Sequence, residues 1–301
     1  MYTSLSDYLK SEYGEKLYKI SLSSGCTCPT RDGSIAVGGC IFCSEGGSGD
    51  FAAKSAGKED GVIVTPDELD MQIEEAKQRV SKKVHVNRFI AYFQSYTNTY
   101  GDIQALRELY TAAIKRPDIA VLSVATRPDC LPDEIVGMLS DLNKIKPVWV
   151  ELGLQTSNEA SATYIRRAYE NGIYEDAVSK LNNVGIKVVT HIILGLPGET
   201  YDDMKASLDY AVSCGTWGVK LQLLHVLSDT DLEKDFRAGM FSVMSMDEYI
   251  STVTSLVKTL PENVVVHRLT GDGPKKLLIA PLWSADKKRV INALSKALNE
   301  N

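Results

Sequence analysis

Residues 26–43 read Cys-Thr-Cys-Pro-Thr-Arg-Asp-Gly-Ser-Ile-Ala-Val-Gly-Gly-Cys-Ile-Phe-Cys, and this stretch decides which fold the chain is expected to have. Cys28, Cys40 and Cys43 lie on one glycine-rich loop, where three thiolates can hold three irons of a four-iron, four-sulfur cluster. The fourth iron would be open to another ligand, which makes it a candidate catalytic centre. The glycine pair at 38–39 lets the backbone turn sharply beside the inorganic core.

A structural zinc site is the alternative for the same loop. Cys26 could complete a set of four thiolates, with the spacing C-x-C followed by C-x-x-C. The loop alone does not distinguish zinc from an iron–sulfur cluster, because both metal centres accept an all-thiolate ligand set.

The composition is that of an ordinary globular protein. The chain has 301 residues, 44% of them hydrophobic and 24% charged, which is enough for one large core. The first residues lack the apolar segment of a signal peptide, and no apolar run reaches membrane-spanning length. We therefore expect a cytoplasmic protein without membrane contact. In that reducing compartment the six cysteines are metal ligands or buried side chains rather than disulfides, and Cys130 and Cys214 are expected in the core.

The net charge of −6 argues against broad non-specific nucleic-acid binding, which needs a basic face. The charge is not uniform, however. One basic cluster is the best local candidate for a phosphate contact, and it consists of Lys77, Arg79, Lys82, Lys83 and Arg88. The alternative is a solvated surface, since cations are favoured at the C-terminus of a helix in any case.

Short apolar strands alternate with amphipathic helices along the chain. Strands are expected at 17–22, 88–93, 120–125, 147–152, 187–194 and 219–224, and helices at 66–80, 103–114, 132–142, 174–184 and 201–212. Strands that are almost entirely apolar indicate a parallel sheet buried on both faces. About six such units predict a partial (β/α)6 TIM-like barrel. We expect one domain over residues 1–301, with a core at about 15–230 and a short helical C-terminal extension at about 231–301.

Polar or glycine-rich segments follow the expected strands. The cysteine loop follows the first strand, and the next four strands are followed by segments that begin at Gln94, Thr126, Gly153 and Gly195. Loops favour such residues anyway. In a barrel, however, the active site lies in the loops at the carboxyl ends of the strands. A zinc site gives no reason for this arrangement, which favours a catalytic cluster facing a cofactor.

Several motifs together resemble the YtqA/YhcC branch of the radical S-adenosylmethionine (SAM) enzymes, over nearly the whole chain. Besides the cysteine loop, they are ELGLQT (151–156), HIILGLPGET (191–200), KLQLLHV (220–226), RLTGDGP (268–274) and LLIAPLWS (277–284). TRPD (126–129) and ELGLQ are also similar to segments of the catalytic Elongator subunit, a more distant relative that modifies wobble uridines in tRNA.

The resemblance implies a [4Fe-4S] cluster on Cys28, Cys40 and Cys43, with the amine and carboxylate of SAM on the fourth iron. One electron then cleaves SAM to a 5′-deoxyadenosyl radical that abstracts a substrate hydrogen. Phe42 would lie against the adenine. The other expected SAM contacts are Gln94, Thr126, Gln155, Arg167 and Gly195.

Some positions carry a competing interpretation. Arg167 could be a solvated charge, and the branch usually has Gly-His where this chain has Ala168-Tyr169. His191 is expected to be a hydrogen-bonded core histidine rather than an acid or base. Cys26 stands where the branch usually has another residue, so it is left out of the ligand set.

By the same resemblance, the expected reaction is maturation of the 5-carboxymethylaminomethyl side chain of a tRNA wobble uridine towards the aminomethyl form. A separate methyltransferase could then act, and flavodoxin or ferredoxin could supply electrons. Candidate substrate contacts are Lys82, Lys83, Arg88 and Arg127. The alternatives are a radical enzyme for a small molecule, favoured by the acidic composition, and a non-catalytic zinc module.

Overall fold

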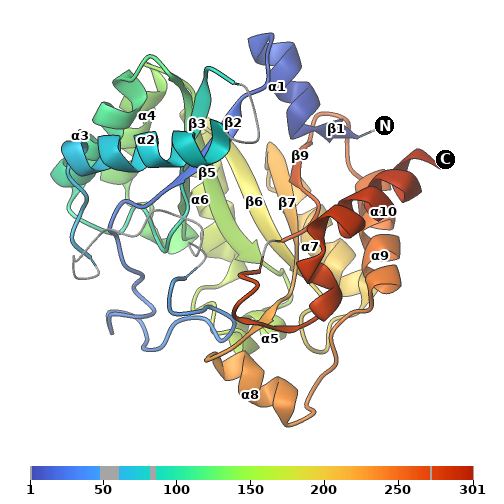
Figure 1. Ribbon diagram of the computed structural model, residues 1–301. Helices are drawn as coiled ribbons and strands as arrows, with labels where there is room; N and C mark the ends of the chain where they lie inside the picture. Colours follow the sequence, from blue (N-terminus) through green and yellow to red (C-terminus); the bar gives the residue numbers. More distant parts are fainter. Residues whose placement is uncertain (1, 48–60, 82–85, 272, 301) are drawn as a thin grey trace.

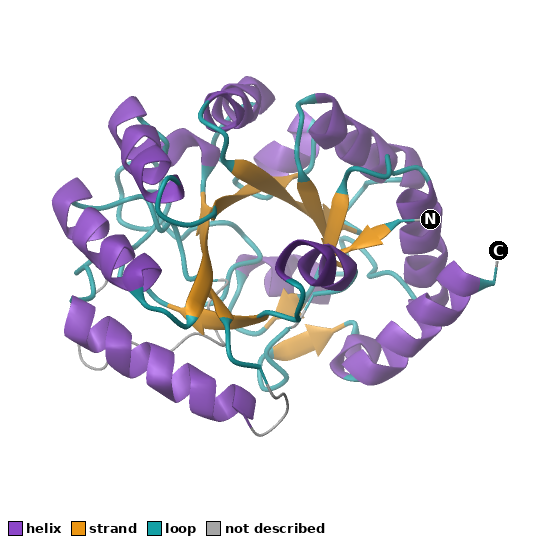
Figure 2. Cartoon of the chain, turned by 90° about the horizontal axis from the view of Figure 1, so that it is seen from above, coloured by secondary structure: helices purple, strands orange, loops and turns teal. Residues whose placement is uncertain are grey.

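One curled sheet of eight parallel strands forms the centre of the molecule, and helices cover its outer face (Figures 1 and 2). The computed structural model describes residues 2–47, 61–81, 86–271 and 273–300. The strand order is β1-β9-β7-β6-β5-β4-β3-β2. Within the described residues β1 and β2 do not pair with each other, so the barrel is open between them. The predicted partial barrel is confirmed.

All six predicted strands are present, and the sheet has two more. The predicted ones are β2 (Tyr18–Leu22), β3 (Phe89–Phe93), β4 (Ile119–Thr126), β5 (Val148–Gln155), β6 (Lys187–Leu194) and β7 (Gly218–Leu223). The sheet continues past β7 through β9 (Val265–Arg268) to β1 (Thr3–Ser4). A separate antiparallel pair joins β8 (Val226–Leu227) to β10 (Leu278–Ala280). The C-terminal region thus supplies a strand to the barrel sheet as well as helices.

The five predicted helices are also present. They are α2 (Pro66–Ser81), α3 (Ile103–Lys115), α4 (Asp133–Asn143), α6 (Asn171–Asn183) and α7 (Tyr201–Ser213). The pattern did not single out α1 (Leu5–Tyr13), α5 (Glu159–Tyr164), α8 (Asp231–Arg237), α9 (Met246–Lys258) and α10 (Lys287–Asn299). None of the helices in the described residues is both long and apolar enough to cross a membrane.

The alternation follows from local sequence chemistry. Every residue of β3 and β4 is buried, as expected for strands with helices on one side and the barrel interior on the other. The helices between the strands begin at side chains that cap free backbone N–H groups. Asp102 accepts the Ala105 N–H at 2.9 Å at the start of α3, and Thr200 and Asp203 form a reciprocal capping box at the start of α7.

Helix α1 covers the barrel at the end where the strands begin (Figure 2). Leu9 of this helix packs with Trp149 of β5, and the Tyr8 ring meets the Trp217 ring edge-on with 4.9 Å between centroids. Trp217 in turn lies 5.0 Å from the Trp149 ring. This aromatic plug leaves the interior of the barrel to be entered from the carboxyl ends of the strands, where the cysteine loop lies.

Candidate active site

The cysteine loop follows β2 and turns tightly at the cysteines. The N–H groups of Arg31 and Asp32 donate to the Cys28 carbonyl at 2.8 and 3.2 Å, and the Cys43 N–H donates to the Cys40 carbonyl at 3.0 Å. Gly39 has a φ of 73°, and a Cβ at this position would lie 3.0 Å from Arg31 Nε. Glycine is needed here for both reasons.

Arg31 fixes the second half of the loop. Its guanidinium donates to the carbonyls of Cys43, Ser44 and Glu45, at 3.3 Å for the first and last of these. It also lies over the ring of Tyr96, 5.4 Å from the ring centroid. A single cation thus ties the cysteine loop to the segment that follows β3.

The three thiols of Cys28, Cys40 and Cys43 line one cavity of about 190 Å³ at the carboxyl ends of the strands. Other predicted site residues that line this cavity are Phe42, Thr126, Arg127, Gln155 and Arg167. The folded chain therefore brings eight of the predicted residues together, from four separate parts of the sequence.

Cys26 lies outside this cavity. Its side chain is 2% exposed and belongs to the main hydrophobic core, where a Cβ on Gly101 would lie 3.5 Å from its sulfur. Burial raises the pKa of the Cys26 thiol to about 11, so the thiolate that a metal needs is disfavoured. Cys130 is buried as well, whereas Cys214 is only partly buried.

The donors that line this cavity are compatible with a cluster. Across the described ranges, no three Cys, His, Asp or Glu side chains are close enough to bind one metal ion together. A four-iron cluster binds each thiolate at a different corner, so its ligands need not converge on one point. A hydrogen bond between Cys40 and Cys43 lowers the pKa of the Cys43 thiol and raises that of Cys40.

Tyr169, which replaces the usual histidine, is part of the cavity wall. Its hydroxyl donates to the Gly153 carbonyl and lies 3.2 Å from the amide of Gln155. Its ring lies 5.0 Å from the guanidinium of Arg127 and 4.7 Å from that of Arg167. Tyr169 therefore shapes the cavity at the position where this chain departs from the family pattern. No sequence motif assigned a role to this residue.

Arg167 is 1% exposed, so the alternative interpretation of a solvated charge is wrong. Its guanidinium donates to the carbonyls of Leu154 (3.2 Å), Thr156 (2.7 Å) and Tyr169 (2.9 Å), and it pairs with Glu159 at 3.1 Å. Four of its five N–H donors are engaged in this way, and two of them bind carbonyls at the end of β5. Gln155 at that end has a φ of 63°, an unusual backbone conformation that these contacts support.

Below the cavity, the buried carboxylate of Glu151 binds side chains from four other strands. Ser123 and Lys19 each lie 2.7 Å from Oε1, His191 lies 2.7 Å from Oε2, and Lys220 also contacts Oε2. Burial alone would raise the pKa of Glu151. The charges of Lys19 and Lys220 outweigh this effect and hold the pKa of Glu151 well below its usual value.

His191 is hydrogen-bonded, as expected from the sequence, but it lines the cavity instead of lying in the core. Its Nδ1 lies 3.1 Å from the amide nitrogen of Gln222, while its Nε2 bonds to Glu151. Burial, together with the charge of Lys220, lowers the pKa of His191 to about 4, so the ring is neutral near pH 7. Glu151, His191 and Gln222 all line the cavity, and the sequence pattern assigned none of them to the site.

Other predicted residues lie elsewhere. Gln94 and Gly195 are not part of the cavity wall, although each follows a strand at the same end of the barrel. Arg88 precedes β3, at the opposite end of the barrel from the cysteines, and pairs with Glu15 at 2.5 Å. Lys82 and Lys83 lie outside the described residues.

The rest of the basic cluster is also paired with acidic groups. Lys77 contacts Glu74 at 3.0 Å and Asp118 at 2.8 Å, and Arg79 contacts Glu75.

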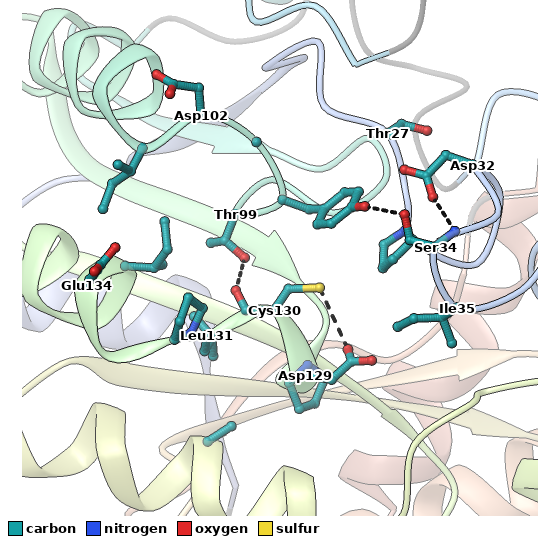
Figure 3. Close-up of a pocket in the computed structure, with 18 of the residues that line it drawn as sticks. Thr27, Asp32, Ser34, Ile35, Thr99, Asp102, Asp129, Cys130, Leu131 and Glu134 are labelled. Atoms are coloured by element: carbon teal, nitrogen blue, oxygen red, sulfur yellow. Dashed lines mark hydrogen bonds between the residues drawn. The ribbon is translucent and has the colours of Figure 1, made fainter.

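Residues of the cysteine loop also line part of a second and larger cavity, of about 1150 Å³ (Figure 3). Asp32 and Ser34 of that loop face Cys130 and Asp129 across it (Figure 3). Its charged lining residues are acidic except for one lysine, and they are Asp32, Asp102, Asp129, Glu134, Asp176 and Lys180. Such a wall repels phosphates, so this cavity does not fit a nucleic-acid backbone.

Comparison with protein families gives matches over most of the chain. Residues 33–211 match the profile of the Radical SAM superfamily, and residues 216–300 match the Radical_SAM C-terminal domain. The uncharacterized protein YtqA of Bacillus subtilis is 40% identical over 297 residues, which is 99% of this chain and 89% of YtqA.

Two more distant similarities involve archaeal proteins of Methanocaldococcus infernus. A tRNA uridine(34) acetyltransferase is 25% identical over 166 residues, or 52% of this chain and 30% of that protein. The structure of Elp3 with an N-terminal deletion has a TM-score of 0.61 at 18% identity and covers 77% of this chain. The present chain spans only 61% of that Elp3, and the likeness shows a shared fold.

Arg167 and its neighbour Arg166 form a matched pair for a test of stability. We expect Arg167→Met to lower the free energy of unfolding by about 3 kcal/mol, because the buried carbonyls at the end of β5 lose their donors. Arg166→Met is expected to cost at most about 1 kcal/mol, because Arg166 pairs with Asp231 at the surface. Urea unfolding of the two variants measures the difference, and equal losses would contradict the assigned role of Arg167.

Proposed function

The chain belongs to the radical SAM superfamily, and we propose that Cys28, Cys40 and Cys43 hold its [4Fe-4S] cluster while the enzyme acts on a wobble uridine of tRNA. The cluster and SAM are the cofactors of this superfamily. The observation that carries the assignment of ligands is the single cavity that all three thiols line. Cys26 is the remaining cysteine of the loop region, and it is buried outside that cavity.

Held by Cys28, Cys40 and Cys43, the cluster would supply the one-electron reductive chemistry on SAM that this superfamily uses. The chain's own residues bind and orient the reactants. Phe42 offers an aromatic face beside the thiols, and Thr126 and Gln155 offer polar groups at the ends of β4 and β5. Gln94, Arg167 and Gly195 complete the proposed set of SAM contacts.

Arg167 contributes to this site mainly by holding neighbouring residues in position. With four of its donors on protein acceptors, it fixes Gln155 and Tyr169 relative to the thiols and leaves one N–H for a ligand. The plug of α1 and its aromatic partners closes the far end of the barrel, which keeps water from entering the lumen from that side.

The proposed substrate is the 5-carboxymethylaminomethyl group of a tRNA wobble uridine, matured towards the aminomethyl form. The archaeal relative is a tRNA uridine(34) acetyltransferase, which supports this choice, as do the TRPD and ELGLQ segments. The proposed substrate contacts are Lys82, Lys83, Arg88 and Arg127, and of these Arg127 lines the cavity. A flavodoxin or ferredoxin as electron donor and a later methyltransferase belong to the same proposal.

A small-molecule substrate is the second candidate. The net charge of −6 and the carboxylate pairing of Lys77, Arg79 and Arg88 favour it, because these cations are less available to phosphates.

Alanine replacements of the cysteines test the ligand set. In anaerobically reconstituted protein, Cys28→Ala, Cys40→Ala and Cys43→Ala should each lose the visible cluster absorbance and most of the iron. The loss should exceed the roughly 10- to 100-fold effect of removing an outer-shell partner of a metal site. The matched controls Cys26→Ala and Cys130→Ala should keep both iron and colour. Full iron content in Cys28→Ala, with loss in Cys26→Ala, would show that a different cysteine is the ligand.

Nucleoside mass spectrometry tests the substrate. In tRNA from a strain that lacks the gene, we expect 5-carboxymethylaminomethyluridine to accumulate while the aminomethyl derivatives disappear. Expression of the wild-type protein should reverse the change, and expression of Cys40→Ala should not. An unchanged set of wobble uridines would move the assignment to the small-molecule substrate.

A further inference from the structure

A layer of polar and charged side chains lies at the bottom of the cysteine-lined cavity and directly beneath it, and we call this layer the lumen floor. It consists of Lys19, Tyr92, Glu151, His191 and Lys220, from five different strands of the barrel. Glu151 and His191 face the cavity, and the two lysines lie directly against the Glu151 carboxylate. The proposed roles of the cysteines and of SAM use none of these groups.

With both lysines protonated, the lumen floor has more positive than negative charge. Two ammonium groups share the single carboxylate of Glu151, and His191 is neutral near pH 7. The charge of Arg268 adds to the repulsion on both lysines. Only 20% of the Lys19 side chain and 4% of the Lys220 side chain are exposed, so water screens this excess charge poorly.

Hydrogen-bond donors are also in excess. Lys220 donates to Glu151 and to the Tyr92 hydroxyl, the latter at 3.0 Å, and Lys19 donates to Glu151 at 2.7 Å. Two ammonium groups carry six N–H donors. Three of these donors have no oxygen or nitrogen acceptor among the residues that the structure describes, although the Tyr92 ring lies within 5 Å of both cations.

Burial makes it energetically costly to keep both lysines charged beside a single carboxylate. It lowers the pKa of Lys19 and lowers that of Lys220 well below its usual value, against the opposing effect of the Glu151 charge. A second anion in the lumen would accept the free donors and balance the charge.

We propose that the lumen floor binds a carboxylate at the reacting end of the substrate, through Lys19 and Lys220. This inference rests on the proposed function, in which the wobble uridine carries a carboxymethylaminomethyl group. The carboxylate would extend past Glu151 and His191 towards the two ammonium groups. The carbon–hydrogen bonds beside the nitrogen would then remain higher in the cavity, nearer the thiols.

A pair of RNAs that differ only in charge tests the proposal. One anticodon stem-loop carries 5-carboxymethylaminomethyluridine at the wobble position, and the other carries its carbamoylmethyl counterpart, which has the same shape without the charge. We expect the reconstituted wild-type enzyme with SAM to bind the carboxylate RNA about tenfold or more tightly, as charge-assisted hydrogen bonds imply. Fluorescence anisotropy measures both dissociation constants.

The variants Lys19→Gln and Lys220→Met should each lose most of this preference. Lys187→Met is the matched control, because Lys187 also lies in the barrel but contacts Tyr8 and Trp217 at the plugged end. Its preference should stay at the wild-type value. If Lys220→Met does not fold, Lys19→Gln decides, since Lys19 lies on the edge strand β2 and is the more exposed of the two.

The outcomes separate the two levels of the proposal. Equal binding of both RNAs by the wild type, or an unchanged preference in a folded Lys19→Gln variant, overturns the role of the lumen floor and leaves the tRNA assignment intact. If the wild type binds neither RNA, the tRNA assignment fails, and the carboxylate site that rests on it fails with it.

Discussion

The buried carboxylate of Glu151 is the interaction on which the barrel interior depends. It lies on β5, and its partners come from β2, β4, β6 and β7, so one side chain links the edge strand to the middle of an open sheet. Among the described residues the edge strands β1 and β2 do not pair with each other, so closure of the barrel does not prevent the sheet from flattening. Charged contacts across the lumen oppose that change, and they keep the carboxyl ends of the strands gathered around the cysteine loop. The same contacts form the bottom of the cavity, so the group that maintains the curvature also sets the charge that a substrate meets.

Much of the fold could be predicted from the sequence because strands buried on both faces are almost continuous apolar runs, as in β3 and β4. The strands that were missed have weaker signals. Only two residues of β1 pair in the sheet, and β9 lies far along the chain among helices, where its pairing with β7 depends on tertiary contacts. The single-domain boundaries stay a prediction.

The site could be predicted only in part. The resemblance of the cysteine loop to the radical SAM enzymes singled out Cys28, Cys40 and Cys43, and folding brings their thiols to one cavity. Tyr169 and Arg167 were harder, since their roles depend on where the end of β5 lies after folding. An arginine beside another arginine looks like a surface pair in sequence, yet one of the two is buried. The lumen floor was missed for a similar reason. From sequence alone a lysine in a strand is predicted to face solvent, because the carboxylate that pairs with it across the barrel is identified only after folding.

The central claim is that three thiols hold a cluster with one iron open to SAM, and spectroscopy of the reconstituted wild-type enzyme tests it most directly. Electron paramagnetic resonance of the dithionite-reduced protein, recorded before and after addition of SAM, measures both the cluster type and the access of SAM to it. The account predicts the signal of a reduced [4Fe-4S] cluster that changes when SAM is added. A protein that binds zinc without iron, or a cluster signal that SAM leaves unchanged, would contradict it.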